Sequence, residues 1–356
     1  MTFDASGGSS FSFNFPFPSI DNGTTTTHDT TTTTRIIAGT AETAVPKEIQ
    51  TFYFLSDTEK RLKAISSLDS TIVLKTTTHS NNNDNGDDDN HEYCLRRVCL
   101  SKKEESALLI QEDDLQQSDI IPGEYEGGLK VWECSLDLCR YLLKHLDTIM
   151  TATTQPIHYV AELGCGHGLP GCLVLQHALK NNNKTKKTKV LFTDFNDFVL
   201  RDVTIPNIWL NTTSMHHFPV GDVAQSVVLG AGDWNQLSDA ILRHQNDNNC
   251  AAKNSRFDML LAAETTYTRE TAQATAQLMA RHLIPTNGVG LVATKRYYFG
   301  CGGGTEAFRE AAASQENVIV DNNRSYKLDI SLVEVYDNGA GNIRELLKVV
   351  LKEVVE

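Results

Sequence analysis

Residues 162–168 read ELGCGHG, and this stretch decides the fold. An apolar run at residues 157–163 precedes the glycines, and a helical pattern at residues 169–179 follows them. A buried strand, a glycine-rich turn and a helix, in that order, place backbone N–H groups and a helix N-terminus beside a ligand. Glycine allows the turn to be tight and the ligand to approach the backbone closely. We therefore predict a cofactor at this turn.

The residues around the turn predict the sheet to which it belongs. Further short apolar runs lie at residues 190–192, 257–263 and 289–293, with a helical pattern at residues 269–283 between the last two. Strands that alternate with helices predict a parallel α/β sheet with helices on both faces, a Rossmann-like fold.

The two ends of this region extend the pattern. Residues 132–146 carry apolar side chains at helical spacing, so we expect a helix before the first strand. Residues 328–335 alternate like a strand, whereas residues 343–354 suit a helix or a strand equally.

The composition changes near residue 120. Threonine tracts and an Asn- and Asp-rich tract at residues 81–90 come before this point, and such tracts bury too little apolar surface to offset chain entropy. We predict that residues 1–118 are a mostly disordered extension with weak local structure, including a short helix and short strands. Residues 119–356 are predicted to form the cofactor-binding domain.

Charge and cysteine usage limit the functional classes. The net charge of −13 argues against a nucleic-acid site and suits a basic partner. We find no secretory signal and no run long enough to span a membrane, so we expect a cytoplasmic or nuclear protein. The eight cysteines form no Cys-x-x-Cys pair and no zinc spacing with histidine, so we predict no metal site.

The spacing of the glycines distinguishes two cofactor classes. Gly164, Gly166 and Gly168 give G-x-G-x-G, whereas dinucleotide sites use G-x-G-x-x-G, and Gly171 leaves some ambiguity. An acidic residue before the first glycine, Glu162, favours S-adenosylmethionine. An acid that could bind ribose hydroxyls, Asp194, ends the next predicted strand. A nicotinamide oxidoreductase is disfavoured, and a tight turn without a ligand remains an alternative.

Three further stretches are GEYEGGLKVWEC at residues 123–134, AETTY at 263–267 and KRYYFGCGGG at 295–304. With the glycine turn and FTDFN at residues 192–196, they resemble the eukaryotic protein-histidine N-methyltransferases of the seven-strand superfamily. The resemblance covers residues 119–356. It implies methylation of a histidine ring nitrogen in a basic, large-subunit ribosomal protein by a monomeric enzyme that uses S-adenosylmethionine.

The resemblance also implies site residues. The implied cofactor-binding residues are Val131, Trp132, Glu133, Cys134 and Ser135 over the methionine end, Glu162, Gly164 and Gly166 in the turn, Asp194, Phe195 and Asn196 near the ribose, Asp233 and Trp234 beside the adenine, and Ala263. The family more often has a small hydroxyl residue where Ala263 stands. Trp132 and Trp234 could instead be core residues, and Asp233 could be a helix N-cap.

The chemistry requires positioning more than a strong base. A neutral imidazole, with a pKa of about 6.5, is already nucleophilic, and an acceptor for its other nitrogen would fix the tautomer. Glu264 and Tyr267 are the predicted catalytic residues, and they match an acidic-x-x-Tyr signature of related lysine methyltransferases. Glu264 could alternatively pair with Lys295 or Arg296. A lysine methyltransferase of the same fold and an inactive cofactor-binding module remain alternative functions.

Overall fold

The structure is a computed structural model, and it describes residues 34–38, 48–49, 69–78, 89–100, 120, 125–152, 157–181, 188–247, 256–315, 318–320, 324–337, 339 and 341–354. Apart from their last residues, the threonine and Asn/Asp tracts predicted to be disordered lie outside these ranges. All elements below belong to one compact unit, residues 32–356.

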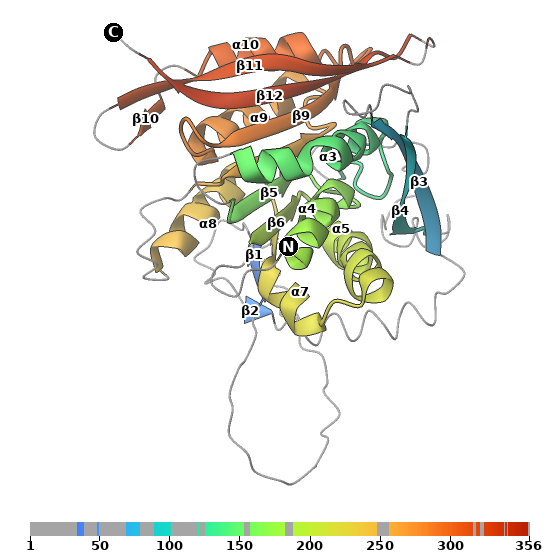
Figure 1. Cartoon of the computed structure of the whole chain (residues 1–356). Helices are drawn as coiled ribbons and strands as arrows, with labels where there is room; N and C mark the ends of the chain where they lie inside the picture. Colours follow the sequence, from blue (N-terminus) through green and yellow to red (C-terminus); the bar gives the residue numbers. More distant parts are fainter. Residues whose placement is uncertain are drawn as a thin grey trace, which may run out of the picture. The chain divides into compact units, whose positions relative to one another are not determined.

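The main sheet has the order β10-β11-β12-β9-β8-β5-β6-β7-β1-β2 (Figure 1). Its strands are β1 (Thr34–Ala38), β2 (Glu48–Ile49), β5 (Tyr159–Leu163), β6 (Lys189–Asp194), β7 (Val227–Ala231), β8 (Met259–Ala263), β9 (Val289–Lys295), β10 (Val318–Val320), β11 (Arg324–Tyr336) and β12 (Arg344–Glu353).

The central seven strands, β7-β6-β5-β8-β9-β12-β11, form the predicted Rossmann-like sheet. Strands β7, β6, β5, β8 and β9 are parallel, and β12 lies antiparallel between β9 and β11. This order confirms the predicted fold class. Residues 343–354, which suited a helix or a strand, form strand β12. This strand pairs with β9 on one side and β11 on the other, and its Leu346, Leu347, Val349 and Leu351 are buried.

Helices cover both faces of the sheet, as predicted (Figure 1). They are α3 (Glu133–Ala152), α4 (Leu169–Lys180), α5 (Asp197–Val199), α6 (Ile205–Trp209), α7 (Val220–Ser226), α8 (Trp234–Asp247), α9 (Arg269–His282) and α10 (Thr305–Ala313), with π-helical segments η1 (Leu200–Thr204) and η2 (Leu210–Ser214) on either side of α6. In the described part of the chain, no helix is long and apolar enough to cross a bilayer.

Side chains that alternate between the two faces of β5 belong to two separate core clusters, one on each face of the sheet. Val160 packs with α3 and α4 on one face, and Ala161 packs with α8, α9 and α10 on the other. Successive strand residues point to opposite faces, so a strand buried on both sides is apolar throughout. The carboxyl ends of β5, β6, β7 and β8 therefore share one edge, where open α/β sheets place their ligands.

A second sheet precedes residue 119. Strands β3 (Asp69–Thr78) and β4 (Asp89–Val98) form an antiparallel hairpin. Leu74 and Leu95 are fully buried in the core cluster that contains α3 and α4. Because the hairpin contributes to this core, the folded unit begins before the predicted boundary at residue 119.

Candidate active site

The glycine turn has the geometry that its sequence predicts. Gly164, Gly166 and Gly168 have φ angles of +59°, +49° and +65°, a region that disfavours other residues. The turn closes with a hydrogen bond of 2.7 Å from the Gly168 N–H to the Cys165 carbonyl, and α4 begins at the next residue. The strand–turn–helix cradle therefore stands at the carboxyl end of β5.

Glu162 stabilises this turn from beneath. Its Oε2 accepts the Gly171 N–H at 2.8 Å, in the first turn of α4. A Cβ on Gly171 would lie 2.4 Å from the Phe192 ring and 2.5 Å from Glu162 Oε2. Burial raises the pKa of Glu162 to about 8, although the Gly171 hydrogen bond opposes the shift. In this geometry Glu162 shapes the turn, and its contact with a cofactor stays a prediction.

Asp194 lies directly beside the turn, at the end of β6. Its Oδ2 accepts the Gly166 N–H at 2.9 Å, and its Oδ1 accepts the Asn196 N–H at 3.1 Å. Burial raises the pKa of Asp194 to about 6, against the effect of these hydrogen bonds. The next residue, Phe195, is half-buried. Asp194 thus lies against the glycine turn, and its contact with a ribose stays a prediction.

Residues 125–132, which we call the lid segment, lie across the turn. A Cβ on Gly166 would come 3.2 Å from the Gly128 carbonyl, and one on Gly128 would come 2.7 Å from Val199 and 3.3 Å from Asp194 Oδ2. Both positions therefore require glycine for close approach. Gly128 was not among the predicted site residues, although two consecutive glycines at residues 127–128 could have indicated a close backbone approach.

The lid segment is also bonded to itself. Trp132 Nε1 donates to the Gly127 carbonyl at 2.9 Å, and the Leu129 N–H donates to the Tyr125 hydroxyl at 2.9 Å. Trp132 is half-buried and does not belong to either of the two large core clusters, and its contact with a cofactor stays a prediction.

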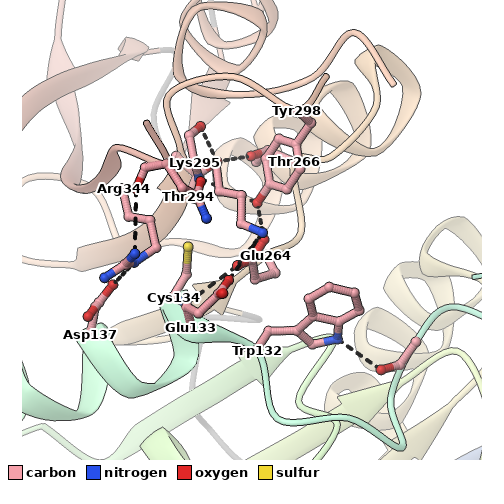
Figure 2. Close-up of polar contacts among 12 residues, drawn as sticks. Trp132, Glu133, Cys134, Asp137, Glu264, Thr266, Thr294, Lys295, Tyr298 and Arg344 are labelled. Atoms are coloured by element: carbon pink, nitrogen blue, oxygen red, sulfur yellow. Dashed lines mark hydrogen bonds and ion pairs between the residues drawn. The ribbon is translucent and has the colours of Figure 1, made fainter. Parts of the chain in front are cut away.

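Glu264 is the centre of a network between α3, β8 and β9 (Figure 2). Tyr298 donates its hydroxyl to Glu264 Oε2, and the Cys134 N–H donates to Oε1 at 3.4 Å. Lys295 Nζ lies 3.8 Å from Oε1. The Glu264 side chain is only 7% exposed, and its φ of +59° is unusual for a non-glycine residue, a form of strain that clusters at functional sites.

The beginning of α3 is tied to the same network. Lys295 Nζ pairs with Glu133 Oε2 at 3.2 Å and lies 5.7 Å from the centre of the Trp132 ring. The Ser135 N–H bonds to the Trp132 carbonyl at 3.2 Å, and Val131 packs on the core. The predicted segment 131–135 therefore lies next to Glu264. Lys295 and Arg296 were the two expected ion-pair partners of Glu264, and of these two only Lys295 pairs with it. Arg296 instead pairs with Glu345.

Tyr267, the second predicted catalytic residue, belongs to a separate network. Its hydroxyl donates to Glu126 Oε2 in the lid segment. Burial, followed by this bond to Glu126, raises the pKa of Tyr267 far above its usual value, so the phenol remains a donor. The Glu126 N–H in turn donates to Asn196 Oδ1 at 3.3 Å. Sequence reasoning did not select Glu126, whose only signal was an acid in the EYEGG motif.

The residues predicted to lie near the adenine are Asp233, Trp234 and Ala263, and the structure gives only their positions. A Cβ on Gly164 would lie 3.5 Å from the Trp234 ring, so this indole borders the turn. Asp233 Oδ1 accepts the Asn235 N–H at 2.9 Å, as expected of a helix cap. Ala263 pairs with Ala293 at the end of β8 and is half-buried. Trp234 also packs against the core cluster that contains α8 and α9, so both of its alternative roles stay open, and the contacts of Asp233, Trp234 and Ala263 with an adenine stay predictions.

The sheet order, the left-handed glycine turn, the adjacent acid and the lid segment define a seven-strand methyltransferase domain. Residues 102–300 match a family model described as lysine methyltransferase, so the chain belongs to this family.

Named relatives narrow the class. A histidine protein methyltransferase 1 homolog from Dictyostelium discoideum is 32% identical over 238 residues, which cover 67% of this chain and 62% of the relative. A homolog of the same name from Bos taurus is 32% identical over 54% of this chain and 50% of its own length. Histidine protein methyltransferase 1 from Saccharomyces cerevisiae is 29% identical over 58% of this chain and 62% of its own length. The resemblance read from the motifs is confirmed, although the chain spans only half to under two thirds of these relatives.

Proposed function

We propose that the chain is an S-adenosylmethionine-dependent protein methyltransferase that modifies a histidine ring nitrogen. The observation that carries the proposal is the glycine turn with Asp194 beside it and the lid segment across it, in a chain whose relatives are named histidine protein methyltransferases. When bound, S-adenosylmethionine supplies a methyl group on a sulfonium.

Glu264 is the proposed acceptor for the N–H of the target imidazole. A carboxylate there would fix the tautomer and stabilise the positive charge that develops on the ring as it is methylated. Tyr298, Lys295 and the Cys134 N–H hold this carboxylate in place. Tyr267 would act through Glu126, by holding the lid segment against the site.

The exposed aromatic side chains of the loop after β9 support the proposal that the substrate is a protein. Tyr298 points inward to Glu264, while its neighbours Tyr297 and Phe299 are 62% and 87% exposed. The Gly304 N–H bonds to the Thr266 carbonyl at 2.8 Å, which fixes the end of the loop against β8's extension. We propose that the two exposed rings contact the polypeptide around the target histidine, since aromatic side chains give large contact area at low entropy cost.

The proposed substrate is a basic, large-subunit ribosomal protein, and the net charge of −13 suits such a partner. We further propose that the enzyme acts as a monomer in the cytoplasm or nucleus. The lysine methyltransferase description of the family favours a second candidate, methylation of a lysine.

One experiment separates these functions. The full chain is incubated with methyl-labelled S-adenosylmethionine and purified large-subunit ribosomal proteins, and the modified residue is identified by mass spectrometry. Methylhistidine supports the proposal, and methyllysine supports the second candidate. Cofactor binding in a titration without any methylated product identifies an inactive binding module and overturns both.

A further inference from the structure

A buried histidine connects the glycine turn to the lid segment. His167 lies inside the turn and is 5% exposed. Its Nε2 is 3.0 Å from the Leu129 carbonyl, which can only accept, so Nε2 carries the proton. Burial lowers the pKa of His167 to about 4, which keeps the ring neutral at physiological pH. The ring therefore donates one directed hydrogen bond to the lid segment.

The other ring nitrogen is fixed by Asn207, which is fully buried in α6. The Asn207 amide nitrogen lies 3.0 Å from His167 Nδ1 and 2.9 Å from the His167 carbonyl. Its Oδ1 accepts the Val98 N–H at 2.7 Å. The Asn207 side chain thus joins the turn to Val98, the last residue of β4, which lies 109 positions before Asn207 in the sequence.

A second asparagine strengthens the attachment of the hairpin. Asn211 lies four residues after Asn207, at the start of η2, and it is also fully buried. Its Oδ1 accepts the Arg96 N–H at 2.9 Å, and its amide nitrogen donates to the Arg96 carbonyl at 2.7 Å. The two asparagines together bind the outer backbone of β4 as a neighbouring strand would.

We infer that the β3–β4 hairpin is a working part of the cofactor site, coupled to the lid segment through the chain Val98–Asn207–His167–Leu129. Asn207 and His167 are positioning residues in this reading. The hairpin lies outside residues 102–300, the part matched by the family model. The inference rests on the proposed cofactor but not on which residue is methylated.

The coupling must act in both directions, because an energetic link between two sites is reciprocal. A cofactor that orders the lid segment will then also slow hydrogen exchange in β4. Loss of the His167 donor will weaken cofactor binding, since the Leu129 carbonyl is left without its partner.

The experiment uses the full chain and S-adenosylhomocysteine as the probe. Affinity is measured by calorimetric titration, and hydrogen exchange is followed in peptides covering residues 89–98 and 125–132. In the wild type, we expect the probe to slow exchange in both peptides. In His167→Leu, we expect affinity about tenfold weaker and no slowing at residues 89–98, as for a lost buried hydrogen bond.

Three variants control this result. His167→Gln offers an N–H near the position of Nε2 and should restore affinity to within about threefold of the wild type. Ser214→Ala removes the 2.9 Å bond from Arg96 at the hairpin surface and should leave affinity and exchange unchanged. Should His167→Leu fail to fold, Asn207→Asp carries the same test, because it keeps the acceptor for Val98 and loses the donor to His167.

Two outcomes overturn the inference. In the first, the probe slows exchange in the lid segment but not at residues 89–98 of the wild type. In the second, both His167→Leu and Asn207→Asp keep wild-type affinity and wild-type slowing. A wild-type chain that does not bind the probe at all refutes the proposed cofactor and, with it, this coupling.

Discussion

The Tyr267 hydroxyl donates to the Glu126 carboxylate across 141 residues of sequence, and this bond joins the segment after β8 to the lid segment. Tyr267→Phe removes the donor and keeps the ring. We expect faster hydrogen exchange in residues 125–132 and turnover lowered by about tenfold, since the half-buried carboxylate loses a charge-assisted hydrogen bond. Glu126→Gln, which keeps an acceptor, should show a smaller effect. Equal turnover in Tyr267→Phe and the wild type would contradict this role.

Glu264→Gln tests the proposed imidazole acceptor. The amide keeps the shape of the side chain but has one acceptor oxygen, so it can keep the bond from Tyr298 or the one from the Cys134 N–H, and it loses the negative charge. We expect kcat to fall by about a hundredfold, within the range for a lost general acid–base group, and cofactor affinity to change little. Single-turnover methylation and calorimetric titration measure the two effects. Undiminished kcat would remove Glu264 from the chemistry.

The exposed rings of Tyr297 and Phe299 are predicted to contact the protein substrate. Replacing both with alanine should raise KM for the protein by about tenfold or more, as for aromatic interface residues, while cofactor affinity stays unchanged. Glu306→Ala, at an exposed position in the first turn of α10, serves as the matched surface control. A double variant with wild-type KM would place the substrate elsewhere.

The buried acids give the cofactor-free chain a defined pH dependence. The folded-state pKa values of Glu162 and Asp194, about 8 and about 6, lie above their ordinary values of 4.5 and 3.8. Their contribution to the free energy of unfolding is therefore fully present below these ordinary values. It is lost progressively as pH rises, until the loss is complete above about 6 for Asp194 and above about 8 for Glu162. Glu162→Gln should flatten the decline between pH 4.5 and about pH 8 in urea denaturation. A decline as steep as that of the wild type would show that the acid is not protonated.

The pH dependence of stability that His167 contributes has the opposite sign to that of Glu162 and Asp194. Its pKa is lowered from 6.5 to about 4, so its contribution is present above pH 6.5 and is lost as pH falls towards 4. His167→Gln should reduce the loss of stability between pH 6.5 and pH 4, measured by the same denaturation experiment. An unchanged acid limb in this variant would mean that other groups dominate it.

Gly171→Ala tests the packing beneath the turn. The added methyl group would overlap the Phe192 ring and the Glu162 carboxylate. Overpacking of this kind costs about 1–3 kcal/mol of stability. Gly221→Ala, where a Cβ meets no atom within 4 Å, is the matched control. Thermal unfolding of both variants measures the difference, and equal midpoints would contradict the predicted clash.

Local patterns in the sequence were enough to predict the strands, the glycine turn and the position of Asp194 at the end of the next strand, because each of these patterns spans only a few residues. Whether residues 343–354 form a helix or a strand was not predictable, since an interior strand and a buried helix are equally apolar. The roles of Glu126, His167 and Asn207 depend on partners far away in the sequence. Their residue types alone carry no sign of those partners.

The attachment of β4 has one more consequence, for the behaviour of the chain in concentrated solution. A strand at the edge of a sheet offers unpaired N–H and C=O groups that can recruit strands from other molecules. On the outer edge of β4, the polar backbone groups of Arg96 and the Val98 N–H are occupied by the amides of Asn207 and Asn211. The two side chains therefore protect this edge against intermolecular pairing, so their loss would favour aggregation as well as weaken the site.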